Sequence, residues 1–155
     1  MDHKDNLILQ KLHQGILTKT ADETIQIAYD LAPLIPEDRI LALHGNLGTG
    51  KTTFVGGLAR AWEIPGPITS PTYNIYTLYD GKRQLVHLDA YRLHSGSDLN
   101  ALMIDDFLSS PWCLAVEWPE RIAEELPVDT WHVYFSIDSD QQHRIQIMCN
   151  NQTHN

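Results

Sequence analysis

The chain has little cysteine, little positive charge and no long apolar run. Only two of its 155 residues are cysteine, too few for a disulfide framework or a zinc site. No apolar run could span a bilayer, and the polar first residues lack the apolar stretch of a signal peptide. These absences predict a cytoplasmic protein without membrane association. The length predicts a single domain over residues 1–155, with a frayed polar tail over 150–155.

Positive charge is especially scarce. The 11 Lys and Arg residues stand against 20 Asp and Glu residues, which gives a formal net charge of −9. Proteins that bind nucleic acid directly need a basic surface, because phosphate contacts dominate their affinity. The sequence shows no basic stripe. We therefore expect no strong direct nucleic-acid binding, so that any nucleic acid involved in the function would be held by a partner.

One glycine-rich segment carries the clearest functional signal. Residues 45–52 read GNLGTGKT, a full match to the phosphate-binding P-loop pattern G-x-x-x-x-G-K-[ST]. The glycines let backbone N–H groups turn toward phosphate oxygens. Lys51 supplies a cation for the β- and γ-phosphates, and Thr52 offers a hydroxyl to Mg²⁺. An apolar run before the loop predicts a strand, and residues 53–62 predict a helix whose N-terminus faces the phosphates.

The remaining pattern predicts an α/β fold, a P-loop NTPase-like mixed β-sheet flanked by helices, with antiparallel hairpin additions. Thr20 and Glu23 form a capping box, which starts a helix that ends near residues 33–36. The dipeptide Asp80-Gly81 predicts a hairpin turn. We also expect strands at 7–9, 39–44, 73–79, 84–88, 112–116, 130–137 and 144–148, a helix at 119–126, and short helices near 97–99 and 105–107.

Two acidic residues, Asp89 and Glu117, each end an apolar strand-like run. If these runs lie beside the P-loop strand, both carboxylates emerge at the carboxyl edge of the sheet, where ligands bind in open α/β sheets. Either acid alone would be interpreted as a helix N-cap or a solvated loop residue. Phosphoryl transfer needs a carboxylate for Mg²⁺ and a group that orients the nucleophile. Beside a P-loop we therefore expect at least one of the two acids to serve the metal, directly or through water.

Three other residues allow two interpretations each. His87 lies inside an apolar run, which favours a core histidine over a catalytic one. Thr72 follows Ser70 and Pro71, a pattern typical of a turn entering a strand but also of a switch-like loop whose hydroxyl approaches the γ-phosphate. Arg144 is either a strand residue with a solvated guanidinium or a cation that reaches the nucleotide from the C-terminal hairpin.

Four motifs, taken together in their order and spacing, resemble the TsaE family, once called YjeE. They are LHGNLGTGKTTF at 43–54, SPTY at 70–73, HLDAYR at 87–92 and EWPE at 117–120. The P-loop alone is generic, but the combination is highly specific and covers nearly the whole chain. The resemblance implies an ATPase needed to make threonylcarbamoyladenosine at adenosine 37 of tRNAs that read codons beginning with A. It also implies two partners, TsaD and TsaB, whose heterodimer the ATPase binds and resets by hydrolysing ATP.

The resemblance further implies roles for individual residues. Lys51, Asp89, Glu117 and Thr72 would be catalytic, with Asp89 near the metal and the nucleophile. The cofactors would be ATP and Mg²⁺, with Thr52 and Glu117 as the metal ligands. The residues implied in nucleotide binding are Thr24 in the first helix, Gly45, Leu47, Gly48, Thr49, Gly50, Lys51, Thr52, Thr53 and Arg144.

Two other functions are compatible with a P-loop. A small-molecule kinase needs an arginine-rich lid to clamp the transferred phosphate, and the few cations after Lys51 form no such cluster. A nucleotide-dependent binding module would use bound ATP only to shape a docking surface. It differs from the ATPase in whether turnover is required, which substitution of Asp89 or Glu117 can decide.

Overall fold

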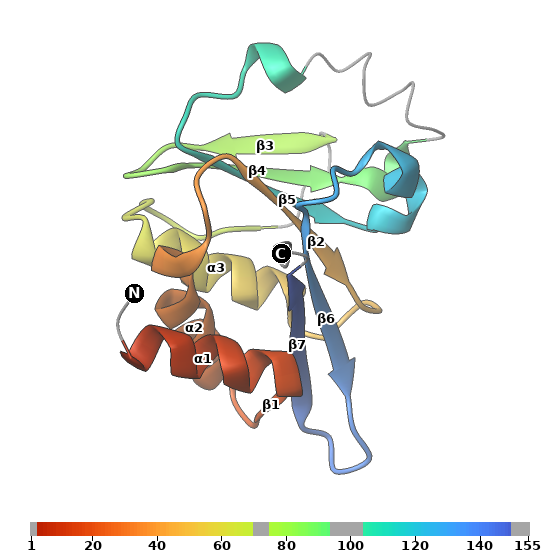
Figure 1. Ribbon diagram of the computed structural model, residues 1–155. Coiled ribbons are helices and arrows are strands. Elements are labelled where there is room, and N and C mark those ends of the chain that lie inside the picture. The colour runs from red at the N-terminus through yellow and green to blue at the C-terminus, as the bar shows by residue number, and fades with distance from the viewer. Residues whose placement is uncertain (1–2, 70–74, 94–103, 150–155) are drawn as a thin grey trace.

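The computed structural model describes residues 3–69, 75–93 and 104–149, and its centre is one mixed seven-stranded sheet (Figure 1). The strand order is β1-β7-β6-β2-β5-β4-β3. The strands are β1 Ile16–Thr18, β2 Arg39–His44, β3 Tyr76–Tyr79, β4 Gln84–Asp89, β5 Trp112–Glu117, β6 Trp131–Ile137 and β7 His143–Cys149. The α-helices are α1 His3–Gln14, α2 Ala21–Leu31 and α3 Lys51–Ala61, and the short 3₁₀ helices are η1 Ala32–Leu34, η2 Ala90–Arg92, η3 Ile104–Asp106 and η4 Pro119–Glu125.

The middle of the sheet is parallel and its edges are antiparallel. β2 runs parallel to both β5 and β6, and β5 runs parallel to β4. The outer strands β3, β7 and β1 each pair antiparallel with their neighbours. Parallel strands covered on both faces have near-continuous apolar runs, which is the pattern at β4 and β5. The predicted α/β class with a mixed sheet and antiparallel hairpins is confirmed.

Two apolar clusters lie on opposite faces of the sheet. The larger one packs α1, α2 and α3 against one face, where Figure 1 shows these helices gathered on one side of the strands. The smaller one lies under η2 and η4. Successive strand residues alternate between the faces, so Leu85 belongs to the larger cluster and Val86 to the smaller. None of the helices among the described residues is long and apolar enough to cross a membrane.

The predicted capping box begins α2, with one change of partner. The Thr20 hydroxyl accepts a hydrogen bond from Glu23 N at 3.1 Å, as the motif requires. The Glu23 carboxylate accepts from Lys19 N at 2.8 Å, one residue before the cap. The helix ends at Leu31, close to where the prolines predicted its end. The N-terminus of α2 lies near the start of α3, because Thr20, Ala21 and Thr24 line one cavity together with Gly50 and Thr53.

Several predicted boundaries need correction. The strand expected at 7–9 is wrong, because these residues lie in α1. Ile8, Leu9 and Leu12 pack into the larger cluster, and their spacing is that of one helix face. The described part of the strand expected at 73–79 begins at Tyr76, whereas residues 70–74, 97–99 and 150–155 lie outside the described residues. η3 begins one residue before the expected 105–107 helix.

The contact between α2 and α3 depends on Gly57. A Cβ atom at Gly57 would lie 2.5 Å from Ile25 O and 2.7 Å from Ala28 Cβ, whereas one at Gly56 would meet nothing within 4 Å. We expect Gly57→Ala to lower the free energy of unfolding by about 1–3 kcal/mol through overpacking. Gly56→Ala is the matched control and should raise it by up to about 1 kcal/mol through helix propensity. Urea unfolding of both variants measures the difference, and equal effects would contradict this packing.

Candidate functional site

The glycine-rich loop connects β2 to α3. Gly45 and Gly50 have φ angles of 151° and 103°, a region that residues with a Cβ atom rarely adopt. A Cβ at Gly45 would also lie 2.7 Å from Phe135 O, so the close approach of β6 requires glycine there. Gly50 is the N-cap of α3, and the first N–H groups of a helix have no partner inside it. The loop therefore presents a helix N-terminus, which favours anions.

Lys51 lies in the first turn of α3 and is 5% exposed. Its ammonium donates to Gly45 O at 2.6 Å and lies 3.7 Å from the Glu117 carboxylate. The same nitrogen is 4.7 Å from the centre of the Trp118 ring. Trp118 has a φ angle of 58°, which is strained for a bulky residue and is typical of functional sites. The buried cation is thus held between a carbonyl, a carboxylate and an aromatic face, beside the glycine loop.

The two predicted acids meet at the carboxyl edge of the sheet. Asp89 and Glu117 are register partners in β4 and β5, and Glu117 is also the register partner of Leu43 in β2. The Glu117 side chain is largely buried. Asp89 caps η2, accepting from Tyr91 N at 3.0 Å, and its second oxygen lies 3.5 Å from Arg92 Nε. The sequence left open whether Asp89 is a helix N-cap or a residue of the ligand-binding edge. In the structure it caps η2 and also lies at that edge.

His87 supports Glu117 from inside the sheet. It is fully buried, and its Nε2 lies 2.7 Å from Glu117 Oε2. An ionised carboxylate only accepts, so Nε2 carries the hydrogen and donates. Nδ1 is buried with no partner among the described residues. His87 is thus a core histidine, as expected, and also a group that positions Glu117. Residues 87, 89 and 117 lie on one face of the sheet, and this alternation could have indicated the contact.

A pair of histidines beside the loop, His44 and His132, is held neutral. His44, the last residue of β2, has its Nε2 2.9 Å from His132 Nδ1. Burial lowers the pKa of His44, with a further decrease from the charge of His132, and burial also lowers the pKa of His132. At neutral pH the end of β2 therefore adds no positive charge. Among the described residues around the loop, Lys51 and the loop N–H groups are the ones that would attract an anion.

The C-terminal hairpin presents His143 to the loop. His143 Nδ1 lies 2.9 Å from Thr49 O. The Arg144 guanidinium instead donates to Gln14 O and Gln146 Oε1, both at 2.9 Å. Neighbouring strand residues point to opposite faces, so one of the two faces the loop. The structure does not bring Arg144 to the loop. His143 shares a strand face with the buried Ile145, and this alternation could have indicated His143 as the residue that faces the loop.

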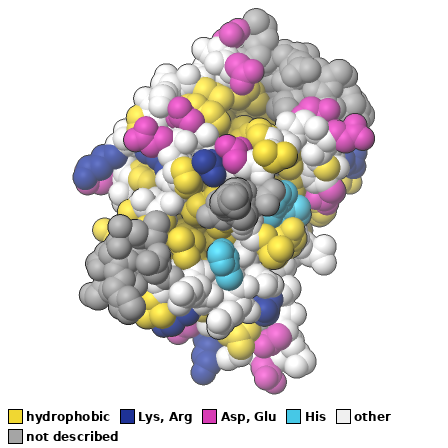
Figure 2. All heavy atoms as spheres, in the orientation of Figure 1, with side chains coloured by type: hydrophobic (Ala, Val, Ile, Leu, Met, Phe, Trp, Pro, Cys, Tyr) yellow, Lys and Arg dark blue, Asp and Glu magenta, His cyan; other side chains and the backbone are white. Residues whose placement is uncertain are grey.

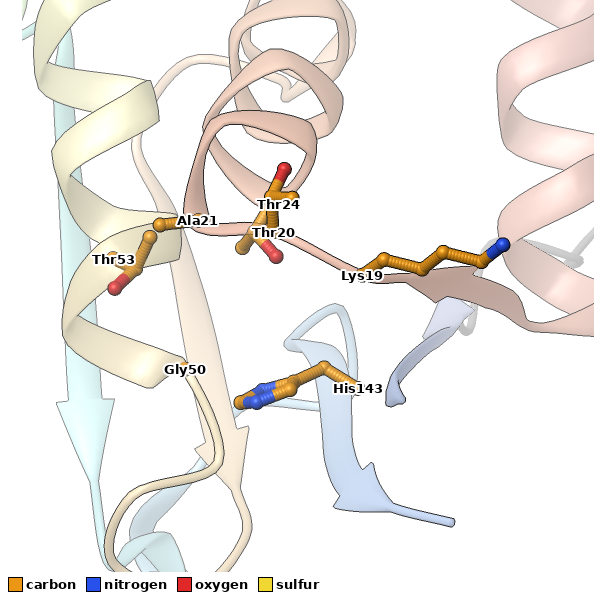
Figure 3. Close-up of a pocket in the computed structure, with 7 residues that line it drawn as sticks. All are labelled: Lys19, Thr20, Ala21, Thr24, Gly50, Thr53 and His143. Atoms are coloured by element: carbon orange, nitrogen blue, oxygen red, sulfur yellow. The ribbon is translucent and has the colours of Figure 1, made fainter. Parts of the chain in front are cut away.

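Two adjoining cavities surround the start of α3. The larger, of about 250 Å³, is lined by Leu47, Gly48, Gly50, Lys51, Thr52, Thr53, Glu117 and His143. The smaller, of about 130 Å³, is lined by Lys19, Thr20, Ala21, Thr24, Gly50, Thr53 and His143 (Figure 3). Gly50, Thr53 and His143 line both cavities, so the two adjoin at these residues.

The structure brings most of the predicted site residues together around these cavities. Thr24 is buried, and its hydroxyl is 2.8 Å from that of Thr18, which holds the N-terminus of α2 against the smaller cavity. Thr49 is turned into the loop, where its hydroxyl donates to Asn46 O at 2.7 Å. Leu47 is 92% exposed at the loop tip. Thr72 lies outside the described residues.

A glycine loop between a parallel strand and a helix, with a lysine in the first helical turn and acids on neighbouring strands, defines a P-loop NTPase-type fold. The family model described as "Threonylcarbamoyl adenosine biosynthesis protein TsaE" matches residues 18–146. The chain belongs to the TsaE family, as its motifs indicated.

Individual relatives agree with this family. The chain is 32% identical to a Treponema pallidum protein over 84% of its own length and 97% of the relative. It is 33% identical to a Bacillus subtilis protein, over 83% and 80% of the two lengths. Both are named tRNA threonylcarbamoyladenosine biosynthesis protein TsaE. A crystal structure of Bacillus subtilis YdiB superposes with a TM-score of 0.70 at 31% identity, covering 88% of this chain and 85% of that one.

Proposed function

We propose that the protein is a P-loop ATPase required for threonylcarbamoyl modification of adenosine 37 in tRNAs that read codons beginning with A. The observation that carries the chemistry is the buried Lys51 ammonium, 3.7 Å from Glu117 and 2.6 Å from Gly45 O. A buried cation beside the N-terminus of a helix favours phosphate. The family and the names of the relatives support the tRNA modification.

The larger cavity is the proposed site for the phosphates. Its lining contains the loop residues Leu47, Gly48 and Gly50 with Thr52 and Thr53, and Thr49 and Gly45 shape the loop behind them. Lys51 exchanges its carbonyl partner for phosphate oxygens when the nucleotide enters. The smaller cavity, next to Thr24, receives the nucleoside. Arg144 has no proposed contact in this arrangement, because α1 holds its guanidinium.

Thr52 and Glu117 fit the requirements of Mg²⁺. They line one cavity and offer a hydroxyl and a carboxylate oxygen, the hard ligands that this ion takes together with phosphate and water. Bound Mg²⁺ would neutralise charge on the phosphates and polarise them toward attack. His87 Nε2 donates to one carboxylate oxygen of Glu117 and so fixes the orientation of the other.

Asp89 and Thr72 are proposed to complete the catalytic set. Asp89 is the register partner of Glu117, so its carboxylate emerges at the same edge and could hold the attacking water or a metal-bound water. The role of Thr72 rests on the family motif alone. Lys51 is the only lysine or arginine among the described residues that line the larger cavity. With no arginine among these lining residues to stabilise the transferred phosphoryl group, we infer a slow intrinsic rate.

The proposed partner is the TsaD–TsaB heterodimer, which ATP hydrolysis resets between cycles of modification in the cytoplasm. The net charge of −9 supports a division of labour in which a partner holds the tRNA. On the face of the molecule drawn in Figure 2, acidic side chains are spread over the described residues, and Lys and Arg side chains form no continuous patch. The protein itself would contribute ATP turnover, and no strong nucleic-acid binding.

Phosphate release from ATP tests this function. The isolated chain should hydrolyse ATP slowly, and addition of the TsaD–TsaB pair should raise the rate, with Lys51→Ala as the blank for contaminating activity. The same assay with tRNA alone should show no increase. Rapid turnover that is indifferent to the pair would contradict a partner-dependent ATPase.

A further inference from the structure

His143 lies where the two cavities meet, because it lines both of them. It begins β7, and Figure 3 shows its ring directed toward Gly50 at the start of α3. Among the described residues that line the larger cavity, His143 is the only one that comes from the C-terminal hairpin. It also lines the smaller cavity, next to Thr20 and Thr24. A molecule that extends from one cavity into the other therefore passes this imidazole.

The contact with the loop fixes which nitrogen of His143 is available. Nδ1 lies 2.9 Å from the Thr49 carbonyl, and a carbonyl only accepts, so Nδ1 carries the hydrogen. In the neutral ring Nε2 is then an acceptor. A Cβ atom at Gly50 would lie 3.3 Å from Nδ1, so the ring is also held against the loop backbone. Nε2 has no hydrogen-bond partner among the described residues.

The chemistry of the ligand identifies what this acceptor would meet. Lys51 and Glu117 line only the larger cavity, whereas Gly50 and Thr53 line both, so a nucleoside attached to phosphates in the larger cavity extends past Gly50 and Thr53 toward the smaller one. The sugar follows the phosphates directly, and a ribose offers hydroxyl donors. We propose that His143 Nε2 accepts a hydrogen bond from a ribose hydroxyl of the bound nucleotide, which makes His143 a specificity-determining residue for ribonucleotides. The inference rests on the proposed nucleotide site.

The test compares ADP, 2′-deoxy-ADP and 3′-deoxy-ADP in titration calorimetry. The wild-type chain should bind one of the deoxy analogues about three- to tenfold more weakly than ADP, the effect of one hydrogen bond. His143→Asn keeps a donor for Thr49 O, since the amide nitrogen of Asn replaces Nδ1, but its shorter side chain places no acceptor where Nε2 was. In this variant ADP affinity should fall by the same factor, and the discrimination should disappear. His13→Asn, at an exposed residue of α1, is the matched control and should behave as wild type.

The outcomes separate this inference from the proposed function. Wild-type protein that binds no ADP at all would overturn the nucleotide site itself. ADP binding without discrimination against either deoxy analogue would overturn the role of His143 alone, even if His143→Asn failed to fold. Discrimination that persists in a folded His143→Asn variant would do the same, because another group would then recognise the hydroxyl.

Discussion

Replacing Lys51 with alanine is expected to weaken ADP and ATP binding by about 100-fold or more. The substitution removes the cation of the larger cavity, whose nitrogen lies 3.7 Å from Glu117 and 2.6 Å from Gly45 O. Each charge-assisted hydrogen bond to phosphate is worth about 1.5–3 kcal/mol. Glu117 would also lose its cationic neighbour, and its carboxylate would then repel the phosphates. Titration calorimetry measures the affinity directly.

The matched control for this substitution is Lys82→Ala. Lys82 is an exposed lysine that pairs with Glu63 and lines neither cavity. Its removal should leave nucleotide affinity unchanged. Wild-type nucleotide affinity in Lys51→Ala would contradict the assignment of the loop as a phosphate site. Equal losses of affinity in both variants would indicate a nonspecific effect of charge.

Replacing Glu117 with glutamine is expected to reduce partner-stimulated ATP turnover by about 10²–10³-fold, the size typical of losing one electrostatic group at a reacting centre. The change removes the carboxylate proposed to hold Mg²⁺. It should leave the fold intact, because the amide oxygen of glutamine can still accept from His87 Nε2. Nucleotide should still bind, since Lys51 remains. Phosphate release in the presence of the TsaD–TsaB pair, measured over a range of Mg²⁺ concentrations, gives the effect.

Glu124→Gln is the matched control, because Glu124 is an exposed acid of η4 that lines neither cavity. Its turnover should equal that of wild type. Unchanged turnover in Glu117→Gln would contradict the role of this carboxylate. Loss of turnover with nucleotide still bound and tRNA modification unimpaired would instead identify a nucleotide-dependent binding module.

Much of the fold follows from local sequence signals that agree with one another. The strands β2, β4 and β5 are apolar runs because both faces of the parallel centre are covered. Once these strands are parallel, the acids that end β4 and β5 must meet at one edge, as Asp89 and Glu117 do. The P-loop pattern predicts the strand, the turn and the helix together, although α3 begins at Lys51, two residues before the expected helix over 53–62. These parts of the site could therefore be predicted without tertiary information.

The features that the sequence did not settle depend on a one-residue difference or on a tertiary contact. Residues 7–9 are apolar in a row, which fits a strand or a helix, and only packing of α1 settles it. At the start of β7 the alternation of faces places His143 and not Arg144 beside the loop. The contact of His87 with Glu117 joins the neighbouring strands β4 and β5, so it depends on how these two strands pair. Each of these features depends on register, which periodicity alone does not fix.

Reconstituted modification of tRNA tests the central claim most directly. The TsaD–TsaB pair, the threonylcarbamoyl donor, substrate tRNA and ATP are combined with this chain, and modified adenosine is counted per heterodimer. If the chain resets the complex through ATP hydrolysis, the wild type should support repeated cycles, whereas Lys51→Ala and Glu117→Gln should stop after the first. Repeated cycles with Lys51→Ala, or none with a wild-type chain that hydrolyses ATP, would contradict the proposed function.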